Sequence, residues 1–286
     1  MDFHEFVEEA RAEIDDTLKR LLSDREDRKI IWKMIESGKR LRPILCILSF
    51  KACNGSDENY NKALNVAAAI ELCHCASLCH DDIVDRDVTR RGKPALWVEA
   101  GIPDALMAGH RAILLGLQIS FAQGAEVANT FLGAWDQSLR GGLMEIDVRK
   151  GLRDPIKFYF DIISKKTASL FSGASKVGAQ IAYVSLNLQA IIEDYGMAVG
   201  VAYQIADDMS ELHEKKEEEL SSLMGKVSNP AGASYIQGFL NTKIEAAIKK
   251  AEDISRDEQI PEGEFKSFMS QLPRYFVDRI LRKGSD

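Results

Sequence analysis

A long apolar segment, residues 62–86, ends in a group of acidic side chains at Asp81, Asp82 and Asp85. Proline breaks helices, and only 7 prolines occur in 286 residues, so the chain has room for long uninterrupted helices. We therefore interpret this segment as one long helix with an apolar body and an acidic end. No strand-like alternation of any length occurs elsewhere, so the predicted fold class is all-α, a helical bundle.

Helix-length segments follow one another along almost the whole chain. Residues 3–22 show the 3.6-residue periodicity of an amphipathic helix. Breaks are predicted near Gly92 and Gly101, and another near Gly133. The predicted helices are 3–22, 43–53, 62–86, 104–131, 133–148, 155–182, 187–213, 234–254 and 262–283. We expect one domain over residues 1–286, with the charged segment 214–234 as a mobile surface segment.

Composition excludes several classes of protein. Hydrophobic residues make up 45% and charged residues 28%, which is typical of a globular protein. The net charge of -7 argues against a nucleic-acid binder, whose domain would carry a basic face. No apolar run reaches the ~20 residues needed to span a bilayer. The five cysteines are odd in number and no signal peptide precedes them, so we expect free thiols in a cytoplasmic protein.

The first acidic cluster has the spacing of a cation site. In a helix, Asp81 and Asp85 share one face, where their repulsion is relieved if a divalent cation lies between them. Magnesium prefers a few carboxylates together with phosphate oxygens and water. The alternative is a solvated helix end, since charge runs usually lie on the surface. Zinc is a further possibility, since cysteine and histidine recur at Cys73, His74, Cys75, Cys79 and His80. In a helix, however, these side chains would point in different directions instead of converging on one ion, which favours buried thiols.

A second apolar helix ends in the same way. It carries Asp207 and Asp208, with Glu211 four residues after the first of them. Asp207 lies 126 residues after Asp81, and two such helix ends are able to share two or three magnesium ions on one diphosphate. The pair is much stronger evidence for a metal site than either cluster alone.

Basic side chains accompany the acids. Lys39 and Arg42 lie on a turn that leads into an apolar helix, and Arg90 and Arg91 follow the first acidic cluster. Lysine offers a compact positive charge to phosphate, and arginine offers a planar group that donates two hydrogen bonds to it. Lys166 lies within an apolar helix, where a lysine is expected to face inward. The alternative is a surface lysine whose apolar stem lies along the helix while its charge reaches water.

Together these motifs resemble the trans-type polyprenyl diphosphate synthase family over about residues 35–212. The resemblance is carried, in order, by Gly38-Lys39-Arg40-Leu41-Arg42-Pro43, the segment from Glu71 through His74 and Ser77 to Asp85, Thr89-Arg90-Arg91-Gly92-Lys93-Pro94, Lys166-Thr167-Ala168, and Tyr203-Gln204 before Asp207-Asp208. It implies an all-helical bundle around a deep central cavity, and a homodimer.

The resemblance also implies a role for each matched residue. Magnesium would be held by Asp81, Asp85 and Asp207, with Asp82, Asp208 and Glu211 as supporting acids. The allylic diphosphate would be held by Arg90, Lys166, Thr167 and Gln204, and isopentenyl diphosphate by Lys39, Arg42, His74 and Arg91. The catalytic set would be Asp81, Asp82, Asp85, Lys166, Gln204 and Asp207, and Lys226 is a further candidate for substrate binding.

The chemistry implied by the resemblance is prenyl transfer. The allylic carbon–oxygen bond ionises, the isopentenyl double bond attacks the cation, and the departing diphosphate takes the proton. The growing tail is expected to run along the helix that bears Asp81. Ala76 and Ser77 are small, which predicts a deeper floor near Cys73 or Ile70 and a product of twenty carbons or more.

The sequence departs from the family pattern after residue 207. Glu211 replaces an aspartate, the loop beyond it keeps only Gly225-Lys226 of the family's pattern, and His110 stands where aspartate is common. These departures leave two alternatives, a non-catalytic subunit of a heteromeric synthase and a class I terpene cyclase. Lys39, Arg42 and His74 argue against a cyclase, which does not use isopentenyl diphosphate. Prenyl transfer to another acceptor also stays open.

Overall fold

The computed structural model describes residues 1–214 and 230–281, without the side chains of 155–156, 211–214 and 230–237. Most of these residues are helical, which confirms the predicted all-α fold class. Two units are distinguished by their internal contacts. Unit 1 comprises Met1–Ile47 and Ser56–Asn129, and unit 2 comprises Leu48–Gly55 and Thr130–Asp286.

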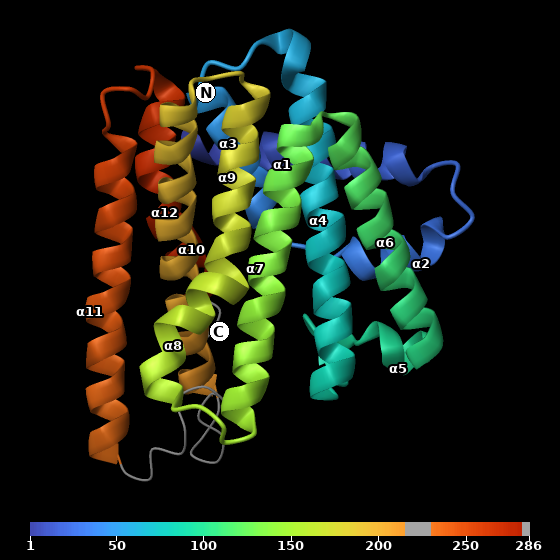
Figure 1. Cartoon of the computed structure of the whole chain (residues 1–286), viewed down its shortest axis with the longest axis vertical. Coiled ribbons are helices and arrows are strands. Elements are labelled where there is room, and N and C mark those ends of the chain that lie inside the picture. The colour runs from blue at the N-terminus through green and yellow to red at the C-terminus, as the bar shows by residue number, and fades with distance from the viewer. Residues whose placement is uncertain (215–229, 282–286) are drawn as a thin grey trace. The chain divides into compact units, whose positions relative to one another are not determined.

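Unit 1 is organised around α4 (Asp57–Asp85), the long apolar segment of the sequence. This helix packs against α1 (Phe3–Leu22), α2 (Arg28–Ile35) and α6 (Ile102–Ala122) (Figure 1). The short α5 (Leu96–Ala100) also packs on α6, and α3 (Leu41–Ala52) begins in unit 1 and ends in unit 2. Apolar residues surround the middle of α4, which is the pattern of a helix buried on all sides.

A two-stranded hairpin, which the sequence did not predict, follows α4. Strand β1 (Thr89–Arg90) pairs antiparallel with β2 (Lys93–Pro94). Arg91 and Gly92 between them have φ of 54° and 75°, so both central residues are left-handed, as in a type I′ turn. The strands are too short to give an alternation signal, and the predicted break at Gly92 proves to be the tip of this hairpin.

Unit 2 is organised around α10 (Leu186–Glu214), the helix of the second acidic cluster. It packs against α9 (Ser169–Ile181), α11 (Pro230–Ser255) and α12 (Glu264–Leu281) (Figure 1). The remaining helices are α7 (Ala125–Arg149), whose first residues belong to unit 1, and α8 (Pro155–Ile163). Ile205, Ile244 and Val277 come from three of these helices and lie in one buried cluster.

The predicted break near Gly133 and the predicted continuous helix 155–182 are wrong. The helix break falls at Gly124, whose φ is 121°, and α7 continues through Gly133. The predicted helix 155–182 is interrupted by a π-helical turn, η1 (Ser164–Ala168). Such a turn inserts one residue into the helical register, which the local hydrophobic periodicity does not reveal. Within this turn the Lys166 carbonyl accepts a hydrogen bond from the Ser138 hydroxyl of α7 over 2.7 Å.

The cysteines are free and buried, as expected for thiols outside a disulfide framework. Burial raises the pKa of Cys46 and of Cys53 to about 12, so neither thiol is poised as a nucleophile. By length and composition, α4 and α6 are each apolar enough to cross a membrane, in contrast to the sequence-based expectation of no such run. Because 72% of the apolar window of α4 is buried within the protein, that criterion is weak evidence for a span.

Candidate functional site

The first acidic cluster lies in the last turn of α4. Asp81 and Asp85 are half-buried, whereas Asp82 is only 3% exposed. The helix ends at Arg86, which adopts a left-handed conformation, and no basic residue occurs in the last turn. Two partly exposed carboxylates on one face therefore flank a buried third.

The hairpin after α4 holds Arg90 against that buried acid. Arg90 donates from Nε to Oδ1 of Asp82 over 2.7 Å, and its Nη2 also contacts this oxygen. Burial raises the pKa of the Asp82 carboxyl, and the Arg90 guanidinium opposes this effect. Arg90 and Arg91 also line one pocket of unit 1 together with Asp82. Here the structure brings together an acid and a base that the sequence predicts for the same site.

A second pair in unit 1 joins two predicted ligands of isopentenyl diphosphate. Arg42, which is 7% exposed, approaches His74 with its Nη1 3.0 Å from the ring Nε2. Burial and the nearby Arg42 guanidinium hold the pKa of His74 well below its usual range, so the ring is neutral at pH 7. A neutral ring accepts the Arg42 hydrogen at Nε2, which places its own hydrogen on Nδ1. That Nδ1 is buried and has no hydrogen-bond partner within the described part of the chain.

The predicted set in unit 2 forms one chain of hydrogen bonds. Thr167 donates from its hydroxyl to Oε1 of Gln204 over 2.7 Å, and Nε2 of Gln204 donates to Oδ1 of Asp208 over 2.9 Å. Tyr159 donates to the other oxygen, Oδ2 of Asp208, over 2.6 Å. Burial and the Asp208 carboxylate raise the pKa of Tyr159, so its hydroxyl keeps its proton. Asp207, next to this chain, is half-buried.

Lys166 projects from the π-helical turn η1. Its Nζ forms an ion pair with Glu145 of α7, a carboxylate that also accepts from Arg149 over 2.9 Å. The Lys166 ammonium group is therefore held by the buried Glu145 carboxylate and does not extend into water as a snorkelling surface lysine would.

The four candidates for chain-length control differ in their surroundings. Ala76 is fully buried and Ile70 is 8% exposed, whereas Ser77 is half-buried and lies one turn before Asp81. Cys73 faces α6, where its thiol lies 3.7 Å from the Ile113 carbonyl oxygen. Of the two small residues, only Ser77 retains exposed surface.

Among the described residues, no group of three or more His, Cys, Asp or Glu side chains is placed to hold a metal ion. Glu211 belongs to α10, but its side chain lies outside the described part. Lys226 and most of the charged segment 214–234 lie outside the described residues. Lys39 is half-buried on the turn before α3.

Three residues have contacts in the structure that the sequence does not predict. Tyr159 and Glu145 had no signal, since each meets its partner only through tertiary packing. Arg40 lies between Lys39 and Arg42 in the basic turn, and the motif implies a role for these two neighbours but none for Arg40. In the structure Arg40 is 1% exposed, which is unusual for arginine and is a signal only the fold provides.

Comparisons with known proteins agree with these motifs. A sequence model of the polyprenyl synthetase family matches residues 26–227. A short chain isoprenyl diphosphate synthase of Methanothermobacter thermautotrophicus is 33% identical over 228 residues, which are 78% of this chain and 67% of that protein. A geranylfarnesyl diphosphate synthase of Methanosarcina mazei is 33% identical over 238 residues, 82% of this chain and 76% of that protein.

The fold is shared with solved structures. A geranylgeranyl pyrophosphate synthetase from the archaeon Geoglobus acetivorans superposes with a TM-score of 0.80, covering 96% of this chain and 99% of that one. At 21% identity this likeness shows the fold alone. The family match, in contrast, includes every candidate site residue from Lys39 to Lys226. The chain belongs to the polyprenyl synthetase family.

Proposed function

We propose that this protein is a magnesium-dependent prenyltransferase. It condenses isopentenyl diphosphate head-to-tail with an allylic diphosphate, and its product is a trans polyprenyl diphosphate of twenty carbons or more. The observation that carries the proposal is the family match over residues 26–227, which contains both acidic clusters and both sets of basic side chains in order. The protein is expected to act in the cytoplasm.

The acidic side chains fit magnesium by their chemistry. Asp81 and Asp85 offer only oxygen donors, are partly exposed, and share one helix face. Magnesium accepts such a small set of carboxylates because phosphate oxygens and water complete its shell. We assign Asp81, Asp85 and Asp207 as ligands, with Asp208 and Glu211 as further candidates in unit 2. When bound, the metal would supply positive charge to the diphosphate that leaves.

The basic residues divide between the two substrates. Arg90, Lys166, Thr167 and Gln204 are assigned to the allylic diphosphate, and Lys39, Arg42, His74 and Arg91 to isopentenyl diphosphate. The contact between the Arg42 guanidinium and Nε2 of the neutral His74 ring supports this assignment, because it places two of the assigned residues side by side. Lys226 remains a candidate from the sequence alone.

These residues would promote ionisation by stabilising the charge that develops on the leaving diphosphate. Donors fixed before the reaction are more effective than mobile ones, because they need no reorganisation in the transition state. Arg90 is fixed by Asp82, and Gln204 by Thr167 and Asp208. The allylic cation then reacts with the isopentenyl double bond, and the released diphosphate accepts the proton. Apolar surroundings would protect the cation from water.

One incubation tests the function. The pure protein is mixed with magnesium, isopentenyl diphosphate and allylic diphosphates of five to twenty carbons, and product length is measured. Condensation with any starter, abolished by a chelator, supports the proposal. No condensation would favour the non-catalytic subunit, an alternative that the altered Asp207–Glu211 motif keeps open. Hydrocarbon released from the allylic substrate alone would identify a cyclase.

Tyr159→Phe is expected to weaken the use of the allylic substrate. The change removes only the hydroxyl that donates to Asp208, so it loosens the chain that orients Gln204. A hydrogen bond to a charged group contributes about 1.5–3 kcal/mol, so stability should fall by that amount, and the KM for the allylic diphosphate should rise. Urea unfolding and steady-state kinetics measure the two effects.

Tyr195→Phe is the matched control. Tyr195 is equally buried and donates to a backbone carbonyl, that of Met269, over 2.7 Å. We expect it to lose stability without a change in the KM for the allylic substrate. Equal kinetic effects in the two variants would show that Tyr159 acts through stability alone.

A homodimer is also proposed. On α6, the exposed apolar side chains Met107, Leu114 and Phe121 are spaced by seven residues, which is the spacing of a helix that packs against another helix. A second copy of the chain would cover this stripe. Leu114→Lys is expected to convert the dimer to a monomer in light-scattering measurements, whereas Val98→Lys, a change at another exposed apolar site, should not.

A further inference from the structure

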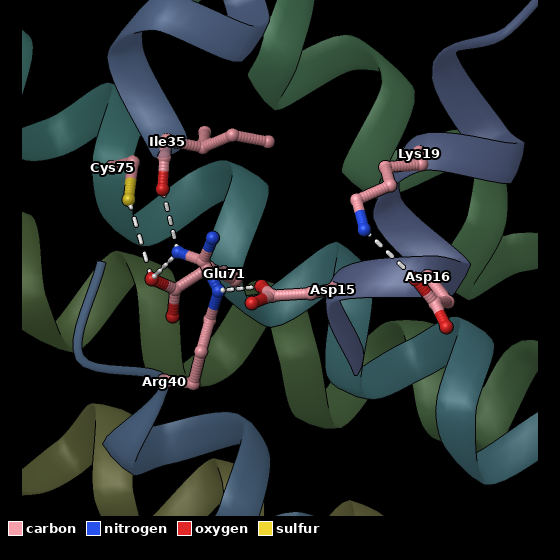
Figure 2. A network of polar contacts seen from close by, with 7 residues as sticks. All are labelled: Asp15, Asp16, Lys19, Ile35, Arg40, Glu71 and Cys75. Carbon is pink, nitrogen blue, oxygen red and sulfur yellow. Dashed lines mark hydrogen bonds and ion pairs between the residues drawn. The ribbon is translucent and has the colours of Figure 1, made fainter. Parts of the chain in front are cut away.

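A buried ion pair in unit 1 ties the basic turn before α3 to the middle of α4. Arg40 and Glu71 are each 1% exposed, and Nη1 of Arg40 donates to Oε1 of Glu71 over 2.8 Å. The same Nη1 donates to the Ile35 carbonyl over 2.6 Å, and Nε donates to Oδ1 of Asp15 over 2.7 Å. Figure 2 shows the guanidinium between the two carboxylates, with the Cys75 thiol also directed at Glu71. Arg40 is thus held by three helices, α1, α2 and α4.

The backbone of the turn is built around this pair. Arg40 has a φ of 57°, a left-handed conformation that costs a non-glycine residue about 1–3 kcal/mol and persists only where the surroundings enforce it. A Cβ atom at Gly38 would collide with both the Arg40 guanidinium and the Glu71 carboxylate. The glycine therefore allows the turn to lie close against the ion pair, and the ion pair holds the turn in a strained conformation.

A buried ion pair is not by itself evidence of added stability. A buried ion pair loses hydration on both sides, and well-packed apolar residues of similar volume are often as stable. Burial disfavours the charge on Arg40, but the carboxylates of Glu71 and Asp15 outweigh it and raise the pKa of the guanidinium. What the ion pair provides beyond apolar packing is direction, because each hydrogen bond fixes an angle as well as a distance.

The segments that the pair joins carry the candidates for isopentenyl diphosphate binding. Lys39 precedes Arg40 and Arg42 follows two residues later, while His74 lies three residues after Glu71 on α4. Arg42 and His74 contact each other across the same two segments. The Arg40–Glu71 pair and the Arg42–His74 pair are therefore two adjacent connections between the turn and α4.

We propose that Arg40 and Glu71 are positioning residues for isopentenyl diphosphate. They set the turn on α4 so that Lys39, Arg42 and His74 hold one diphosphate, without contacting it themselves. The inference rests on the proposed function, since it assigns a supporting role to residues of that site.

Two conservative variants test the role. Glu71→Gln keeps the shape of the side chain but removes its charge, and Arg40→Lys keeps the charge but removes the planar donor group. Small displacements of binding groups are costly, so we expect a rise of about ten- to a hundredfold in the KM for isopentenyl diphosphate. The KM for the allylic diphosphate should stay unchanged. Tyr60→Phe, which removes a different contact between α1 and α4, is the control and should change neither KM.

A double variant separates positioning from stability. Arg40→Met with Glu71→Leu replaces the ion pair by apolar packing, which is expected to restore the unfolding temperature. The KM for isopentenyl diphosphate should nevertheless stay high, because the directional contacts to Ile35 and Asp15 are gone. A return of this KM to the wild-type value along with stability would overturn the proposal.

A direct binding measurement distinguishes failure of the positioning role of Arg40 and Glu71 from failure of the proposed function. Calorimetric titration of isopentenyl diphosphate into wild type, Glu71→Gln and Tyr60→Phe does not depend on turnover. Weaker binding in Glu71→Gln alone supports the positioning role. Equal affinity in all three refutes it, even if the wild type condenses its substrates. A wild type that binds isopentenyl diphosphate but makes no product would instead refute the proposed function.

Discussion

Asp81→Asn is expected to lower kcat by about a thousandfold. The substitution removes one of the two carboxylates at the exposed face of the α4 end while keeping its size. A bound metal stabilises the leaving group by several kcal/mol, and each 1.36 kcal/mol changes the rate tenfold, so the loss of ~4 kcal/mol gives this factor. Steady-state turnover at saturating substrates measures it.

The loss should not be accompanied by unfolding. Asp81 and Asp85 repel each other across one helical turn, so removing one charge is expected to leave the unfolding temperature unchanged or slightly higher. Asp57→Asn makes the same change in the exposed first turn of α4 and should keep full activity. Near-normal turnover in Asp81→Asn would remove Asp81 from the set of metal ligands.

Ser77→Phe is expected to shorten the product by at least one five-carbon unit. Ser77 is half-buried and lies one turn before Asp81 on the same face of α4, so an aromatic ring there would extend from the face along which the tail is expected to run. The ring would then form a floor closer to the reacting carbon. Chromatography of the dephosphorylated products gives the length distribution directly.

The neighbouring residue provides a contrast. Ala76 is fully buried, so Ala76→Phe would overpack the interior, at a cost of about 1–3 kcal/mol in stability. Its effect on product length would therefore be mixed with an effect on folding. Ser77→Ala is the cleaner control, because it keeps a small side chain and should keep the product length. If folded Ser77→Phe makes products of unchanged length, the tail does not pass this position.

The hydrophobic periodicity of short sequence segments was sufficient to predict much of the fold. Helix α1 was predicted over 3–22 and observed at Phe3–Leu22, because one apolar face repeats along its whole length. The break near Gly133 was wrong, since one glycine lowers helix propensity by only about 1 kcal/mol and α7 continues through this position. The π-helical turn at Ser164–Ala168 had no local signal either, because its extra residue changes register without changing composition.

The candidate site was predictable in its residue types but not in its internal pairing. The acids and bases follow recognisable spacings, so Asp82 and Arg90 were both identified. That they bind each other depends on a two-residue hairpin, which alternation cannot detect. Arg40 was harder still, because its partners Asp15 and Glu71 lie 25 and 31 residues away along the chain. Charged residues are usually exposed, so nothing local indicates that this one is buried.

The end of α4 also has an electrostatic consequence for the folded chain as a whole. The carboxyl end of a helix carries a partial negative charge, which favours cations in the last turn. Here the last turn contains Asp81, Asp82 and Asp85 and no basic residue. These negative side chains therefore interact unfavourably with the partial negative charge of the helix end. A ligand that binds only the folded state raises stability as its concentration rises. Folding of this protein should therefore be thermodynamically linked to the supply of divalent cations, with the end of α4 as the part that gains most.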